Sequence, residues 1–204
     1  MAAKAMISST YRWRLLLIAL MGIGWGGWSI YDGFWNYPAQ DVVANAFQEV
    51  KAKNPDTWRD VWTKTATANG WSTEDPGAPH SAFDRRAQYV MAAITLPFGL
   101  FFGWAYLTSF NRWVATDEQG VSTSTGQQAP FSSITKLNKD RWKTKGIARV
   151  YYTDSQGGER RIVLDDWKYE ARPTQQMLEE IEAQLKPEQI VGGAAEVKGS
   201  EGDI

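Results

Sequence analysis

The sequence predicts a membrane protein with two transmembrane α-helices and a small cytoplasmic α+β domain. Two apolar runs, residues 13–33 and 87–110, each match the roughly 20 helical residues that cross a bilayer core. The chain has 11 Trp residues, and Trp favours interfaces between apolar and aqueous surroundings. After residue 110, short alternating runs with turn residues between them predict an antiparallel curled sheet, and one amphipathic helix follows.

The first apolar run contains Gly22-x-Gly24-x-x-Gly27, the spacing of a dinucleotide-binding loop. Such a loop needs a strand before it and an amphipathic helix after it. Here the uncharged run from Leu15 to Ile30 passes straight through the glycines. The context therefore favours a membrane helix, and we expect no nucleotide or other cofactor.

The same glycines have a second interpretation. Gly22 and Gly26 are four residues apart and share one helix face, and Gly99 and Gly103 repeat this spacing in the second run. Small residues at that spacing allow a second helix to approach closely in a membrane. We expect these four glycines to pack helices together, either within a hairpin or against the helices of a partner.

The segment between the two runs, residues 34–86, is expected to lie outside the cytoplasm and to form two short amphipathic helices. Asn54-Pro55 is a typical helix start, and Asn69-Gly70 a typical end. Trp58 and Trp62 share one helical face. They either pack against the neighbouring helix or contact a partner, and both interpretations remain open at this point.

The flanking charges predict the orientation. Lys4, Arg12 and Arg14 lie near the start of the first run, and Arg112 follows the second. The positive-inside rule then places both termini, including residues 1–12, in the cytoplasm, and we expect a bacterial inner membrane. The adjacent pair Arg85 and Arg86 weighs against this orientation.

The domain after the second run resembles a known family. The strands "WVATDEQGV", "ITKL", "IARVYY" and "RIVL", followed by a C-terminal helix, are similar to bacterial pleckstrin-homology-like (PH-like) domains that follow membrane hairpins. The resemblance covers residues 111–186 and implies a partly open β-barrel capped by a helix. It also implies a role in binding and assembly. Residues 187–204 contain few core-forming side chains and are expected to be disordered.

One basic patch in this domain could meet anionic lipid headgroups or an acidic partner. Its residues are Lys136, Lys139, Arg141, Trp142, Lys143 and Lys145. A solvated hairpin would show the same pattern, because alternate strand residues face water.

The residues that most catalytic sites require are scarce. The chain has no Cys and a single His, His80, which lies in a loop. We expect no enzymatic activity, no metal and, at a net charge of −1, no nucleic-acid partner. The expected function is a non-catalytic scaffold or accessory subunit that binds other integral membrane proteins. The alternative is a membrane-anchored sensor that binds lipid or peptide through the basic patch.

Overall fold

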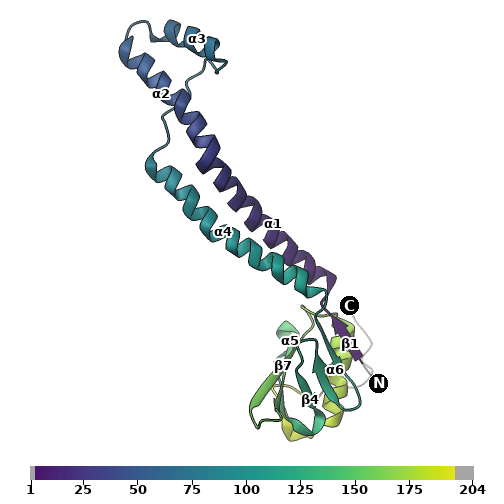
Figure 1. The fold of residues 1–204 in the computed structure, drawn as a ribbon. Coiled ribbons are helices and arrows are strands. Elements are labelled where there is room, and N and C mark those ends of the chain that lie inside the picture. The colour runs from purple at the N-terminus through teal and green to yellow at the C-terminus, as the bar shows by residue number, and fades with distance from the viewer. Residues whose placement is uncertain (1–2, 196–204) are drawn as a thin grey trace. The chain divides into compact units, whose positions relative to one another are not determined.

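A computed structural model describes residues 3–195, and the chain divides into two compact units. Residues Leu17–Gly103 form the helical unit, and the chain on either side of them forms the sheet unit. Figure 1 shows the helices and strands along the chain.

The helical unit contains one long continuous helix. Helix α1 (Ser9–Tyr31) runs through a π-helical segment (Asp32–Asn36) into α2 (Tyr37–Lys53). The first predicted span, residues 13–33, lies within this helix, which continues beyond it to Lys53. Asp32 is buried and accepts a hydrogen bond from the side chain of Asn36 at 2.8 Å, so the polar residues here continue the helix.

Two further helices follow. Asn54 ends α2 instead of starting the next helix, because its side-chain amide donates to the Val50 carbonyl. Helix α3 (Trp58–Asn69) ends, as predicted, at Gly70, whose φ is +69°. Helix α4 (Ala82–Ser109) begins five residues before the predicted position. Its start is set by Ser81 and Asp84, which exchange hydrogen bonds in a capping box.

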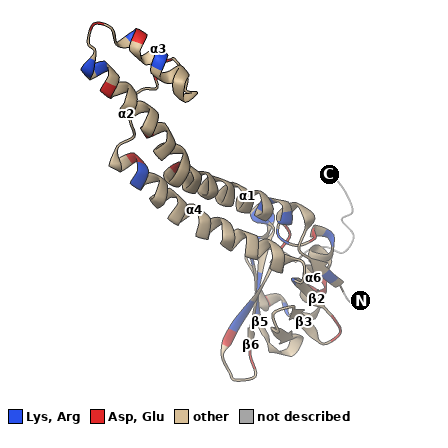
Figure 2. Cartoon of the chain, turned by 45° about the horizontal axis from the view of Figure 1, so that its top comes forward, with Lys and Arg blue, Asp and Glu red and all other residues tan. Residues whose placement is uncertain are grey.

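The described chain has two helical stretches long and apolar enough to cross a membrane: the continuous helix Ser9–Lys53 and helix α4. Figure 2 shows α1 and α4 in tan along most of their length, with charged residues gathered near their ends. This arrangement is typical of membrane-spanning helices, whose central residues avoid charge.

The sheet unit contains two four-stranded sheets. In order across the first, antiparallel sheet lie β1 (Ala3–Met6), β2 (Trp113–Thr116), β3 (Gly120–Thr123) and β4 (Gln128–Pro130). In order across the second lie β7 (Glu159–Asp165), β6 (Ile147–Thr153), β5 (Ile134–Arg141) and β8 (Ile190–Val191). A helical turn α5 (Trp142–Lys145) joins β5 to β6, and helix α6 (Ala171–Gln184) follows β7.

Both sheets and α6 contribute to one hydrophobic core. Met177, Leu178 and Ile181 of α6 are fully buried, so the amphipathic helix that the sequence predicts after the strands buries one face in this core. Val114 of the first sheet and Leu164 of the second are fully buried in the same core. Helix α6 therefore holds the two sheets together by burying its apolar face between them.

The N-terminal strand β1 was not anticipated. Its residues come before the first apolar helix, yet they pair with β2 after the second, with Ala3 opposite Thr116 and Met6 opposite Trp113. Ala5 is fully buried, and β1 packs directly against α6. The domain predicted over residues 111–186 is thus completed by a strand from the other end of the chain.

The C-terminal boundary also differs from the expectation. Residues 187–191, expected to be disordered, form a 3-10 turn (Pro187–Gln189) and strand β8, which runs parallel to β5. The Gln189 side chain donates to the Ile134 carbonyl at 2.7 Å, which fixes this segment against the edge of β5. Residues 196–204 of the expected tail lie outside the described residues.

We predict that the domain requires β1 for full stability. The fragment of residues 111–195 alone should melt roughly 8–16 °C lower than a fusion protein. In that fusion protein, a short flexible linker joins residues 3–8 to the same fragment. The buried Ile7 and the strand contribute about 2 kcal/mol or more, and a domain of this size shifts by about 4–8 °C per kcal/mol. A short linker is feasible because the Ile7 nitrogen lies 3.3 Å from the Arg112 oxygen.

Melting of both soluble fragments by circular dichroism tests this prediction. The matched control is the linked fragment with Ala5→Asp, which places a charge at a fully buried position and should melt like the fragment without β1. Equal melting temperatures for the linked and unlinked fragments would contradict the prediction.

Candidate functional site

The backbones of α1 and α4 touch at two glycines. A Cβ added to Gly22 would lie 2.7 Å from the Cα of Gly99, and one added to Gly99 would lie 2.6 Å from the Ile23 nitrogen. Real Cβ atoms do not approach backbone so closely, so neither position accepts a side chain without moving a helix. At this pair the neighbouring helix is supplied by the same chain.

The other two predicted glycines differ from each other. A Cβ on Gly26 would lie 2.5 Å from the Leu96 Cγ, so Gly26 also belongs to the contact. At Gly103 the nearest atom would be the Ala19 Cβ at 3.9 Å, an ordinary contact that does not require glycine. Gly24 and Gly27 have no atom within 4 Å of an added Cβ and lie on the exposed side of α1.

The two tryptophans of α3 pack within the helical unit. Trp62 is 2% exposed and contacts Phe47 of α2 edge to face, with ring centroids 5.1 Å apart. Trp58 is half-buried and also meets Phe47 edge to face. Of the two interpretations left open by the sequence, the structure supports packing between helices, and Trp62 offers almost no surface to a partner.

Lys139 does not belong to the basic surface predicted for β5 and α5. It is 2% exposed, and its Nζ lies 2.5 Å from a Glu182 oxygen on α6. The same Nζ donates to the Ala194 carbonyl at 2.7 Å. Removing either charge of a buried pair leaves the other uncompensated, so this pair ties β5 to α6 instead of binding lipid.

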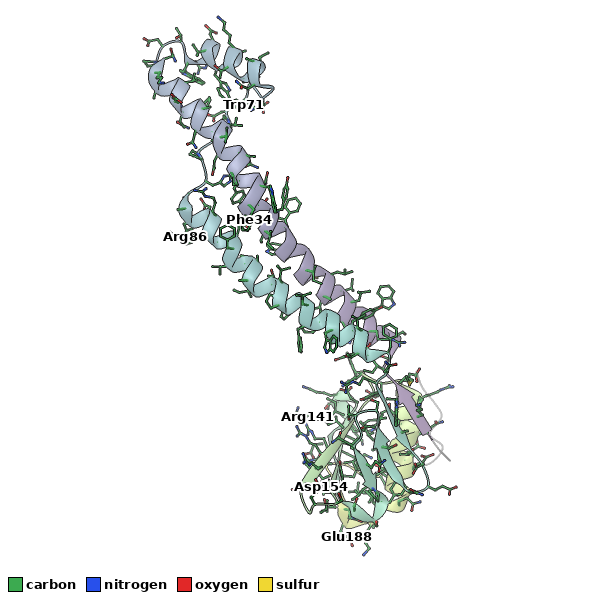
Figure 3. The ribbon with its side chains drawn as sticks, viewed as in Figure 1. Phe34, Trp71, Arg86, Arg141, Asp154 and Glu188 are labelled. Atoms are coloured by element: carbon green, nitrogen blue, oxygen red, sulfur yellow. The ribbon has the colours of Figure 1, made fainter. Side chains whose placement is uncertain are left out.

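The other members of the predicted patch separate into three groups. Lys136 is exposed and lies over the Tyr151 ring, 4.6 Å from its centroid. Trp142 is half-buried against the core and anchors the α5 turn. The exposed cations Arg141, Lys143 and Lys145 remain together around this turn. Figure 3 shows Arg141 at the edge of the sheet unit.

The helical unit contains a polar contact between Asp41 and His80 that the sequence did not indicate. The His80 ring nitrogen lies 2.9 Å from an Asp41 oxygen, and the His80 backbone N–H donates to the same oxygen at 2.6 Å. The Tyr37 ring stacks on the His80 ring at 3.8 Å, and Gln88 donates to the Tyr37 hydroxyl. The partners are 39 residues apart in sequence, so no local pattern could have revealed the contact.

This contact changes the acidity of Asp41, which lies outside the apolar runs. Burial by itself raises the pKa of the Asp41 carboxyl, but hydrogen bonds and charge from His80 outweigh it and lower the pKa from its ordinary value of 3.8. The ionised carboxylate is therefore the form that stabilises the contact. It joins the start of α2 to the loop that leads into α4.

Comparison of the chain with protein-family models, curated proteins and solved structures finds no match. Among residues 3–195, no group of three or more His, Cys, Asp or Glu residues is placed to hold a metal ion. The exposed apolar side chains of α1 and α4 and the cationic turn at α5 are the candidate functional surfaces.

We predict that Gly99→Ala destabilises the helical unit by about 1–3 kcal/mol, the usual cost of overpacking a tight contact. Thermal unfolding of the full chain in mild detergent would measure the loss. The matched control is Gly24→Ala, which adds the same methyl group where no atom lies within 4 Å. Equal stability of the two variants would contradict the packing role.

We also predict a pH-dependent contribution from Asp41. Because its pKa is lowered in the folded state, its stabilisation is complete above about pH 4 and is lost as the pH falls through the folded pKa. Asp41→Asn should cost about 1–3 kcal/mol near neutral pH and should flatten the pH profile below about pH 4.

Melting temperatures of the full chain between about pH 3 and pH 7 measure both effects. Asp56→Asn, at an exposed position beyond α2, serves as the control. An unchanged profile for Asp41→Asn would show that the contact with His80 does not contribute to stability.

Proposed function

We propose that this chain is a non-catalytic integral membrane scaffold or accessory subunit of a larger membrane complex. The observation that carries the proposal is the exposure of large apolar side chains on α1 and α4. Trp25 and Trp28 of α1 are 62% and 66% exposed, and Trp104 of α4 is 69% exposed. Such a surface is costly in water and requires lipid or other proteins to cover it.

One face of α1 is suited to a partner helix. Gly22 and Gly26 are already used against α4, whereas Gly24 and Gly27 leave open space on the exposed side. Glycine at such positions allows the backbone of a second helix to approach closely. The flanking Trp25 and Trp28 would then pack against the sides of the incoming helix.

The proposal also includes a PH-like binding domain, and the fold of the sheet unit supports it. Two four-stranded sheets with helix α6 in their common core fit a partly open barrel capped by a helix. The departure from the resemblance is β1, which comes from before the first apolar helix. In this proposal the domain serves binding and assembly.

The charges near the helix ends support an orientation with this domain in the cytoplasm of a bacterial cell. All four basic residues belong to the sheet unit: Lys4 precedes α1, Arg12 and Arg14 lie in its first two turns, and Arg112 follows α4. The positive-inside rule favours the cytoplasmic side for such residues. Arg85 and Arg86, at the start of α4, favour the opposite orientation.

The test is purification of the tagged full chain from native membranes in mild detergent, followed by native size separation and mass spectrometry. We expect the chain to resist alkaline carbonate extraction and to migrate with larger membrane proteins. The double variant Gly24→Ile, Gly27→Ile should lose these partners. Ala93→Ile, which adds bulk at an exposed position of α4, is the control. Release by carbonate, or migration as a monomer, would refute the proposal.

A membrane-anchored lipid- or peptide-binding sensor is the second candidate. The observation that favours it is the exposed group Arg141, Lys143 and Lys145 at α5. A cationic turn next to a bilayer can attract anionic lipid by about 1 kcal/mol per residue. In the same purification, migration without partners would favour this candidate.

A further inference from the structure

The sheet unit contains an open cleft of about 590 Å³, a volume typical of ligand sites. One side is formed by the ends of the two apolar helices, with Tyr11 and Leu15 of α1 and Ala105 of α4. The other side is formed by the sheets and the segment that leads into α6. All of its lining residues belong to the sheet unit, which includes residues 9–16 of α1 and 104–109 of α4.

The polar side of the cleft is cationic. Arg112, Arg161 and Lys168 line it, and the one carboxylate in the lining is Asp165. One Asp165 oxygen already accepts hydrogen bonds from the backbone nitrogens of Trp167 and Lys168. Among residues 3–195, no carboxylate forms an ion pair with any of the three cations. They are therefore available to an anionic ligand.

Two pairs of aromatic and basic side chains lie close in sequence to lining residues of this cleft. The guanidinium of Arg14 lies 5.4 Å from the Trp167 ring centroid, and that of Arg12 lies 4.9 Å from the Phe110 ring centroid. Trp167 is 64% exposed. Figure 2 shows basic residues in blue where α1 begins. Trp beside Arg is typical of the headgroup level of a bilayer, where one end of the ring is apolar and the other wet.

The apolar and cationic sides together match one class of ligand. An anionic phospholipid carries a charged phosphate next to acyl chains, and its phosphate needs cations at the depth where the chains begin. The cleft offers Arg112, Arg161 and Lys168 on its polar side and Leu15 and Ala105 on its apolar side. Arginine suits a phosphate well because its planar donors bind two oxygens at once.

We propose that this cleft binds the headgroup of an anionic phospholipid, with Arg112, Arg161 and Lys168 holding the phosphate and the helix ends contacting the acyl chains. The proposal rests on the membrane insertion proposed above but not on a protein partner. It is separate from the α5 turn, whose three cations do not line the cleft. A lipid held there would contact both the helix ends and the strands of this unit.

The experiment uses the full chain in detergent, with native mass spectrometry to count bound lipids. The probes are phosphatidylglycerol, phosphatidylcholine and inorganic phosphate. We expect phosphatidylglycerol to remain bound and phosphatidylcholine to bind at least tenfold more weakly. The triple variant Arg112→Gln, Arg161→Gln, Lys168→Gln should weaken phosphatidylglycerol binding by about fivefold for each cation removed.

The matched control removes the same number of charges from the same unit. Arg160→Gln, Arg172→Gln, Lys186→Gln, at exposed positions that do not line the cleft, should leave phosphatidylglycerol binding unchanged. If the triple cleft variant does not fold, Arg161→Gln alone, at an exposed position of β7, supplies the test with about a fivefold loss.

Three outcomes would overturn the proposal. Equal loss in the cleft variant and the control variant would indicate a general charge effect. Equal binding of the two phospholipids would show that the cations do not select the headgroup. Binding of inorganic phosphate as tightly as phosphatidylglycerol would identify a free-phosphate site. Each result leaves carbonate extraction and partner migration unaffected, so failure here is distinguishable from failure of the scaffold proposal.

Discussion

The pairing of β1 with β2 is the constraint on which the sheet unit depends. It joins residues 3–6 to residues 113–116, although two long apolar helices separate them in the sequence. The pairing covers an edge of β2 and buries Ala5 against α6, so the domain is complete only when residues 3–6 meet the strand that follows α4. For a membrane chain, this requires both outer ends of the helical pair to lie on one side of the bilayer, which allows only an even number of crossings between them.

The glycine contact between α1 and α4 decides which faces of the two helices are buried and which remain exposed. Gly22, Gly26 and Gly99 allow the two backbones to meet, because any side chain there would strike the neighbouring helix. The large apolar side chains consequently point outward, where Trp25, Trp28 and Trp104 remain more than half exposed. Dispersion forces and close packing hold the pair together, since lipid supplies no hydrophobic force between membrane helices. This division leaves Gly24 and Gly27 as the small residues still open to a partner.

Each unit also contains a polar contact that fixes segments distant in sequence. In the sheet unit, Lys139 of β5 meets Glu182 of α6, and both side chains are almost fully buried. In the helical unit, Asp41 of α2 holds His80 of the loop before α4 through its ring and its backbone. Buried or partly buried charges tolerate few alternative arrangements, because an unpaired charge is costly to keep from water. Such contacts favour one arrangement of segments that apolar packing alone would leave less defined.

The sequence by itself determined the elements whose pattern is local: the two apolar helices, the buried stripe of α6 and the end of α3 at Gly70. It also predicted close helix packing at Gly22, Gly26, Gly99 and Gly103. Only the tertiary structure decided which helix they pack, that β1 and β8 complete the sheets, that Lys139 is buried, and which cations line the cleft. The physical reason is sequence distance. Periodicity and capping report neighbours within a few turns, whereas a short strand such as Ala3–Met6 or a lone cation such as Lys139 acquires its role from a segment far away in the chain.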